Sequence, residues 1–131
     1  MATKDDVESF LYRMEGGRLE VRELKDGLWV VRQPDNGEVV VTYAPPVVVI
    51  RVRVMELPTD EPRRSDLLRQ LLQYNAGDLV HGSYGLEGDH VVLTDTLELE
   101  NLDFNEFEAS FDSLTIALAS HLTALAPYRE R

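Results

Sequence analysis

Acidic residues are the densest group of chemically capable side chains in this sequence. Seven acids and no Lys or Arg lie in one stretch: Asp95, Glu98, Glu100, Asp103, Glu106, Glu108 and Asp112. Carboxylates that converge can hold calcium through oxygens at about 2.3–2.6 Å. The stretch has no calcium loop of the Asp-x-Asp-x-Asp-Gly type, and its charges fall on the polar side of an expected strand and at an expected helix start. A solvated acidic surface is therefore the favoured interpretation.

The remaining reactive residues are scattered. His81, His90 and His121 lack the spacing of a helical zinc pair, and there is no cysteine for a thiolate site. The sequence has neither a Gly-x-Ser-x-Gly elbow nor a phosphate-binding Gly-x-x-x-x-Gly-Lys loop. We therefore expect no catalytic residue, no cofactor and no enzyme. One alternative stays open, a small-ligand or metal-binding regulatory protein that uses the carboxylates with His90 or His121.

The charge balance restricts the partners. The chain has 13 basic and 24 acidic residues and a formal net charge of −11, which disfavours direct binding of nucleic acid. A negative protein can instead attract basic segments of a partner, which could itself be a nucleic-acid-binding protein. The longest apolar run, residues 47–50, is far shorter than the ~20 residues of a membrane span. We expect no membrane association and a cytoplasmic location.

Hydrophobic periodicity places these side chains on a mixed architecture. The chain's 131 residues predict a single domain over 1–131. The expected order is α-ββββ-α-ββ-α, an α+β fold in which short turns force an antiparallel sheet that packs against helices. The expected helices are 4–15, 62–75 and one within 101–126, and the expected strands are 18–24, 28–32, 39–43, 47–57, 82–86 and 90–99. Gly16-Gly17 should end the first helix, and Asp35-Asn36-Gly37 should form a hairpin turn.

Two details refine this prediction. Asp103 is a plausible N-cap of the last helix, and Glu106 three residues later completes a capping box. In the strand 90–99, Asp95 interrupts a face of Val and Leu residues, which indicates a bulge or a frayed edge at that position.

The strands also predict an interaction surface. In 47–57 the side chains of Val48, Ile50, Val52 and Val54 should face the helices, and those of Val47, Val49, Arg51, Arg53 and Met55 should face away. The strand 28–32 is apolar on both faces, and the helices are too few to cover both. A partly apolar second face therefore indicates a dimer or partner surface. The side chains expected to make apolar contacts, some of which must instead be core, are Trp29, Val31, Val47, Val49, Leu68 and Leu72.

The second half of the chain resembles a known group of folds. The residues that carry the resemblance are Leu71-Leu72-Gln73-Tyr74-Asn75, Gly82-Ser83-Tyr84-Gly85-Leu86, Gly88-Asp89-His90-Val91-Val92-Leu93 and Leu97-Glu98-Leu99-Glu100-Asn101-Leu102-Asp103. This order of phrases, across roughly residues 62–125, is similar to that of the YbjN family and of the class I type III secretion chaperones, which share a fold.

The resemblance implies a compact α+β domain that is commonly dimeric and binds another protein. Secretion chaperones hold extended segments of their clients on hydrophobic surface, and YbjN proteins are loosely tied to stress responses. We therefore expect a non-enzymatic, chaperone-like module and a homodimer. An exposed strand edge could add an extended peptide, and the acids expected to steer basic segments toward it are Glu98, Glu100, Glu106 and Glu108.

Overall fold

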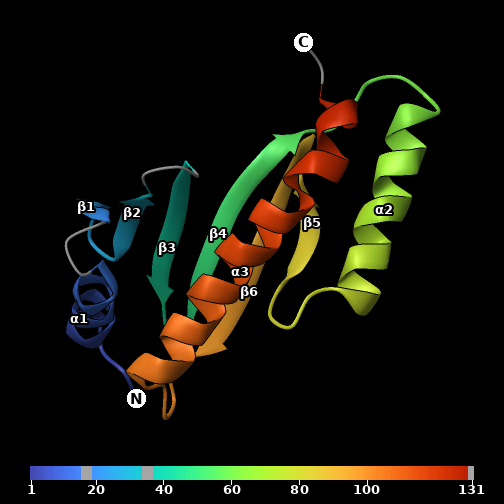
Figure 1. Ribbon diagram of the computed structural model, residues 1–131. Coiled ribbons are helices and arrows are strands. Elements are labelled where there is room, and N and C mark those ends of the chain that lie inside the picture. The colour runs from blue at the N-terminus through green and yellow to red at the C-terminus, as the bar shows by residue number, and fades with distance from the viewer. Residues whose placement is uncertain (16–18, 34–36, 130–131) are drawn as a thin grey trace.

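The chain folds into an antiparallel sheet with helices on one face (Figure 1). The computed structural model describes residues 1–15, 19–33 and 37–129. Its helices are α1 (Lys4–Glu15), α2 (Arg63–Gly77) and α3 (Phe104–Leu125), followed by a 3-10 turn at Ala126–Tyr128. Its strands are β1 (Glu20–Lys25), β2 (Leu28–Arg32), β3 (Glu38–Ala44), β4 (Val47–Glu56), β5 (Ser83–Glu87) and β6 (His90–Glu98). The expected helix end at Gly16-Gly17, the strand start at Arg18 and the Asp35-Asn36 part of the hairpin turn lie outside the described residues.

The sheet has the order β1-β2-β3-β4-β6-β5, and every described neighbouring pair is antiparallel. The predicted fold class and element order are therefore confirmed. The connection through α2 carries the chain past β4, so that β5 and β6 return on the far side and β1 and β5 become the two edges.

Four residues that pair across neighbouring strands form a row that identifies the face of the sheet covered by the helices. Trp29 pairs with Val41, Val41 with Ile50, and Ile50 with Asp95, so these four side chains share one face. The indole Nε1 of Trp29 donates to Glu8 Oε2 of α1 at 3.0 Å. At the other end of the row, Asp95 contacts α3. Both helices therefore pack on the same side of the sheet, where the core lies.

Asp95 is not at a bulge. It pairs in register with Ile50 on the helix face of β6, and Ser110 Oγ of α3 donates to its Oδ2 at 2.5 Å. Ser110 is fully buried, and His81 Nδ1 lies 4.0 Å from the same carboxylate oxygen. The bulge or frayed edge expected at Asp95 is wrong, because a polar partner on the facing helix satisfies the carboxylate within a regular ladder.

The irregularity lies in the opposite strand instead. The register of β4 against β6 shifts between Arg53 and Met55. An extra residue reverses the alternation of the strand, so Met55 turns into the core at 7% exposure and Val54 is only half-buried. The expectation that Met55 faces away from the helices is therefore wrong, whereas Val48, Ile50 and Val52 are buried as predicted.

Helix α3 crosses the sheet diagonally and provides most of the helical side of the core (Figure 1). The predicted capping box is confirmed, because Asp103 Oδ1 accepts from the Glu106 N–H at 2.8 Å and Glu106 Oε1 accepts from the Asp103 N–H at 3.3 Å. Phe107, Phe111 and Leu114 are buried against the sheet. The cap thus fixes where the apolar stripe of α3 meets the strands.

Ion pairs hold α1 against the β1–β2 turn. Lys4 Nζ lies 2.7 Å from Asp26 Oδ1 and 2.9 Å from Glu23 Oε2. Hydrogen bonds to Asp26 and Glu23 raise the pKa of Lys4 above its usual value. Val7 and Leu11 of α1 are fully buried, so the helix is docked by apolar packing and these exposed pairs set its orientation.

Candidate interaction surface

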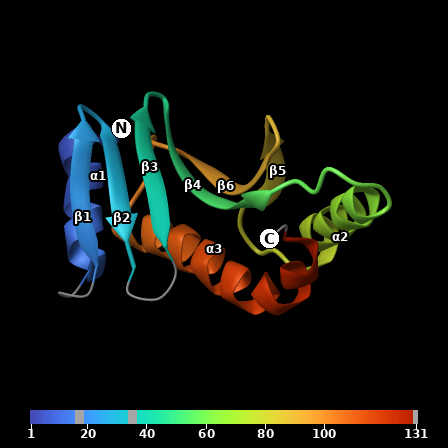
Figure 2. The same ribbon diagram turned by 90° about the horizontal axis from the view of Figure 1, so that it is seen from above.

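The face of the sheet opposite the helices carries aliphatic side chains that no described helix covers. Figure 2 shows no helix on the side of β4 and β6 that faces away from α3. The register places these side chains on adjacent strands. All but Val92 are half-buried rather than buried. We call them the open-face patch: Leu28, Val30, Val40, Val47, Val49 and Val92.

Arginines frame the open-face patch. Arg51 Nη1 pairs with Glu87 Oε2 at 3.0 Å, a bridge that runs from β4 to β5 across the position of Val92 on β6. Arg32 pairs with Glu38. Arg22 and Arg53 have no ion-pair partner within residues 1–15, 19–33 and 37–129. The open face therefore combines apolar surface with unpaired positive charge, although the chain as a whole is acidic.

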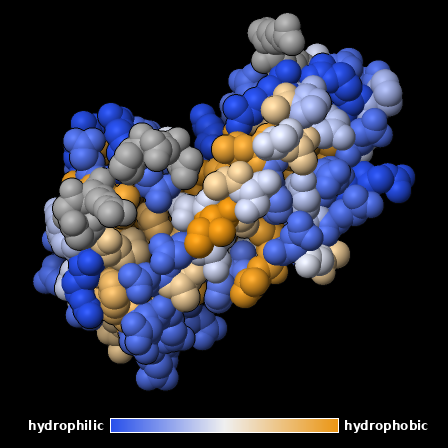
Figure 3. Space-filling view, in the orientation of Figure 1, coloured by the Kyte–Doolittle hydropathy of each residue, from blue (hydrophilic) through white to orange (hydrophobic). Residues whose placement is uncertain are grey.

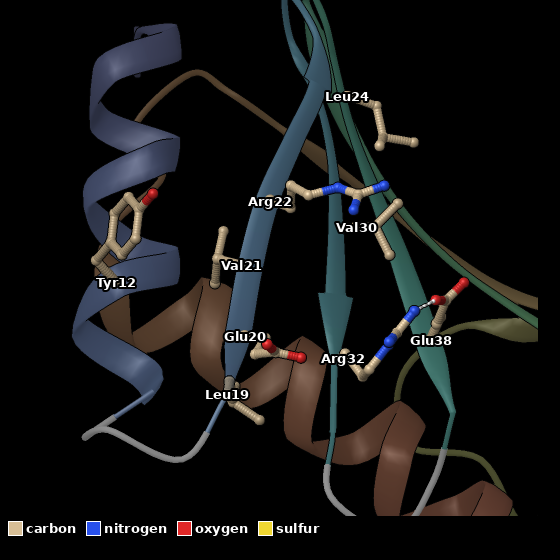
Figure 4. Close-up of a pocket in the computed structure, with 9 residues that line it drawn as sticks. All are labelled: Tyr12, Leu19, Glu20, Val21, Arg22, Leu24, Val30, Arg32 and Glu38. Atoms are coloured by element: carbon tan, nitrogen blue, oxygen red, sulfur yellow. Dashed lines mark hydrogen bonds and ion pairs between the residues drawn. The ribbon is translucent and has the colours of Figure 1, made fainter.

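A groove of about 510 Å³ lies where the open face meets the edge strand β1. Figure 4 shows Arg22, Val30 and the Arg32–Glu38 pair on one side of β1, and Tyr12 of α1 on the other. All β1 side chains except that of Val21 are exposed. Among the described strands β1 has β2 as its one neighbour, so its outer edge is where another strand could add.

The opposite edge of the sheet is partly covered by a side chain of α2. Asn75 of α2 donates from Nδ2 to the Tyr84 carbonyl at 3.0 Å and accepts from the Tyr84 N–H through Oδ1 at 2.7 Å. Tyr84 is the second residue of β5, and among the described strands β5 has β6 as its one neighbour. The amide of Asn75 therefore occupies the backbone groups that an added strand would need at this edge. Strand addition is thus favoured at β1 over β5.

The predicted contact residues divide between core and surface. Trp29 and Val31 are fully buried, so these two are among the predicted residues that belong to the core instead. Val47 and Val49 lie on the open face as predicted. On α2, Leu68 is half-buried and Leu72 is 68% exposed, away from the open face. Val30 and Val40 are part of the open-face patch, although nothing in the sequence separated them from core valines.

The acidic residues do not form one steering surface. Glu98 lies beside Val47 at the end of the open face, whereas Glu108 belongs to α3 on the opposite layer. Glu106 is engaged in the capping box, and Glu100 follows β6 in a turn. These four acids therefore lie on different parts of the molecule, and their role in steering a basic segment stays a prediction.

The residues proposed for a metal site also lie apart. His90 Nε2 is 3.4 Å from Glu56 Oε1, and His121 Nε2 is 3.3 Å from Asp78 Oδ2, so neither histidine joins the carboxylates of the acidic stretch. Within the described ranges, no group of three or more His, Asp or Glu side chains is arranged to hold a metal ion.

An aromatic cluster joins α2, α3 and β5. The rings of Tyr74 and His121 stack at 3.7 Å, and Tyr84 Oη lies 2.7 Å from His121 Nδ1. Burial raises the pKa of Tyr84 well above its usual value. The second ring nitrogen of His121, Nε2, lies 3.3 Å from Asp78 Oδ2, so the imidazole bridges Tyr84 and Asp78. The cluster fixes the end of α2 beside the sheet.

A match to a known protein family identifies the family of this chain. The family model CesT_Tir_1 matches residues 1–131, the whole of the chain. The chain belongs to this family of type III secretion chaperones. Membership makes it a chaperone-like, partner-binding module, as the resemblance predicted. A search of curated proteins finds no match to the sequence.

Solved structures agree with this CesT_Tir_1 fold. A chain of the heterodimeric ExoU–SpcU complex from the type III secretion system of Pseudomonas aeruginosa matches with a TM-score of 0.71 and 17% identity, over 95% of this chain and 98% of that one. The Yersinia pestis secretion chaperone SycH in complex with a fragment of YscM2 matches with a TM-score of 0.61 and 18% identity, over 89% and 97%.

A third match, in the ExsC–ExsE complex, has a TM-score of 0.62 and 14% identity, over 92% of this chain and 94% of that one. At such identities these matches establish the fold. Separately, none of the described helices is both long and apolar enough to cross a membrane.

Proposed function

We propose that this CesT_Tir_1 protein is a secretion chaperone that holds an extended segment of an effector protein across the open-face patch. One observation carries the proposal: the patch is an aliphatic surface on a sheet whose other face already has its helices. Apolar side chains of a client would cover Val30, Val40 and Val49, which are half-buried in the free chain. The solved complexes that resemble this chain support the proposal, since they pair a chaperone with another protein.

The client segment adds to the sheet at β1. A strand there would gain backbone hydrogen bonds from the free edge and would place alternate side chains beside Val30. Arg22 and Arg53 favour carboxylates in or beside this segment. Asn75 supports the choice of edge, because it already bonds the backbone N–H and C=O of Tyr84 in β5.

The absence of cysteine allows a site-specific test. Thr42→Cys places one thiol on the open face, between Leu28 and Val49 in the register, for attachment of a photocrosslinker. Thr123→Cys is the matched control, on an exposed position of α3. In lysate of the native cell, we expect Thr42→Cys to crosslink one client in near-stoichiometric amount and Thr123→Cys to leave it free. Equal capture at both positions, or capture only at Thr123, overturns the proposal.

Hydrogen exchange on the recovered complex tests the edge. We expect slower exchange of amides in β1 and unchanged exchange at Tyr84 of β5. Slower amide exchange in β5, with unchanged exchange in β1, would place the client at β5 and would overturn the proposal of strand addition at β1. Crosslinking at Thr42 would still support client binding on the open face.

We propose in addition that the chain is a homodimer that associates through α2, where Leu72 is exposed. Light scattering should give twice the 14.9 kDa of one chain, whereas a monomer would have a radius of gyration of about 14 Å. Leu72→Asp should give a monomer, and Ile116→Asp on exposed α3 should remain dimeric. A monomeric wild-type chain at micromolar concentration would overturn this proposal alone.

The finer parts of the prediction remain proposals. A kinship with YbjN proteins and a role in a stress response follow from the resemblance, whereas the cytoplasmic location follows from the short apolar runs of the sequence. The client recovered by crosslinking at Thr42 would test them together, because its identity names the process that the chaperone serves.

A further inference from the structure

A second apolar groove lies on the helical side of the molecule, away from the open face. It lies between the end of α2 and the middle of α3 and has a volume of about 510 Å³. Its floor is the stacked pair of Tyr74 and His121, and its walls include Val80 and Ile116, which are 85% and 65% exposed. Figure 3 shows hydrophobic side chains gathered along α3 on this face. Such exposure of two aliphatic side chains beside an aromatic floor is typical of a contact surface.

The charges around this groove all have one sign. Asp78 lies in its lining, and Asp112 lies one helical turn before Ile116 on α3. Burial, followed by the charge of Glu108, raises the pKa of Asp112 above its usual value. No Lys or Arg occurs from residue 101 to residue 128 or from 70 to 82, the segments that form both walls. The groove therefore combines apolar side chains with acidic ones, and neither segment that forms it carries a Lys or Arg.

We propose that this groove binds a basic, amphipathic segment of a second partner protein, distinct from the client on the open face. Aliphatic side chains of the segment cover Val80 and Ile116 and stack above the Tyr74 ring. Its Lys or Arg side chains reach Asp78 and Asp112. The chaperone thus has two binding surfaces of opposite charge on opposite sides of its sheet, so the second partner can be engaged while a client is held.

The probe for this groove is a short labelled peptide with Lys and Leu at helical spacing. Two matched peptides separate its chemistry, one with Glu in place of Lys and one with Ser in place of Leu. We expect the Lys–Leu peptide to shift amide NMR signals of residues 78–81 and 113–121, and its affinity to fall with salt. Neither matched peptide should bind with comparable affinity.

Variants then localise the binding. Val80→Ser with Ile116→Ser should weaken binding of the Lys–Leu peptide by at least about tenfold, because two exposed aliphatic contacts are lost. Leu86→Ser is the matched control, an exposed leucine on β5 outside the groove that should leave the affinity unchanged. Asp78→Asn with Asp112→Asn should weaken binding and reduce its salt dependence.

Four results would overturn the proposal. Signal shifts spread over every acidic surface, or equal binding of the Lys–Ser peptide, would mean attraction by net charge alone. Unchanged affinity of the double serine variant would place the peptide elsewhere. Loss of the dimer in the double serine variant would mean that a second copy of this chain occupies the groove. The client test is independent of all four, since photocrosslinking at Thr42→Cys can be repeated in the double serine background.

Discussion

The side-chain amide of Asn75 makes both available hydrogen bonds with the backbone of Tyr84, one to the carbonyl at 3.0 Å and one from the N–H at 2.7 Å. A helix side chain thereby takes the place of a neighbouring strand at the edge of the sheet. This relationship makes the two edges unequal, since no side chain in residues 1–15, 19–33 and 37–129 covers β1 in this way, and it gives the sheet a preferred side for growth.

Replacing Asn75 should both destabilise the chain and open this edge. We expect Asn75→Ala to lower the free energy of unfolding by about 1–3 kcal/mol, because two backbone groups lose their partner. Urea unfolding measures the change, and the Tyr84 amide should exchange faster. Gln73→Ala, at an exposed position of the same helix, should stay within about 0.5 kcal/mol of the wild type. Equal midpoints for the two variants would contradict this role of Asn75.

Gly82 should tolerate no side chain. Its φ is +76°, and a Cβ would lie 2.5 Å from the Thr94 carbonyl oxygen and 2.6 Å from Leu114 Cδ2. We expect Gly82→Ala to cost about 3 kcal/mol or more, since backbone and helix would have to separate. Gly85→Ala has open space around the added methyl and should change stability by less than about 1 kcal/mol. Similar thermal midpoints for both alanine variants would refute this difference.

Tyr84 should make the chain sensitive to alkali. Burial is the main cause that raises its pKa in the folded state, followed by the charges of Tyr74 and Asp78. The folded chain therefore holds this proton more tightly than the unfolded chain, and stability should fall as pH rises above about 10, the usual pKa of tyrosine.

The variant Tyr84→Phe tests this origin. At neutral pH it should lose about 1 kcal/mol with its hydrogen bond to His121, and above pH ~10 its stability should fall less steeply than that of the wild type. Tyr12→Phe, at an exposed position, is the control. An identical alkaline slope in Tyr84→Phe and wild type would exclude Tyr84 as the cause.

The buried hydroxyl of Ser110 should matter through Asp95. We expect Ser110→Ala to cost about 1–3 kcal/mol, because the Asp95 carboxylate would keep its half-buried position without its donor. Adding Asp95→Leu should recover part of the loss, since leucine extends the apolar row that contains Ile50. Chemical denaturation of the single and double variants tests this, and a double variant less stable than Ser110→Ala would disprove it.

Local sequence signals predicted the positions of helices and strands better than they predicted which face of each strand is buried. The Asp103–Glu106 spacing was sufficient to place the start of α3, because both capping bonds are made within one turn. In β2, however, Trp29 and Val30 are both apolar, so alternation alone could not show which side chain faces the helices. The contact between Trp29 and Glu8 of α1 decides this, and it depends on tertiary structure.

Long-range contacts explain the remaining differences. The bulge that turns Met55 inward depends on how β4 pairs with β6, and no glycine or proline marks it in the sequence. Asn75 was recognised only as part of a family-like phrase, and its bonds join residues nine positions apart. The groove beside Ile116 was not predicted, because α3 reads as a single apolar stripe until its neighbour α2 is in place.

The chain has a single tryptophan, and it lies fully buried with its indole N–H bonded to Glu8. Its fluorescence therefore reports the contact between α1 and the sheet, as well as unfolding of the whole chain. Undocking of that helix would expose the indole to water and shift its emission to longer wavelength, with no label attached. Tryptophan emission can thus show whether α1 stays packed on the sheet when a client binds to the open face.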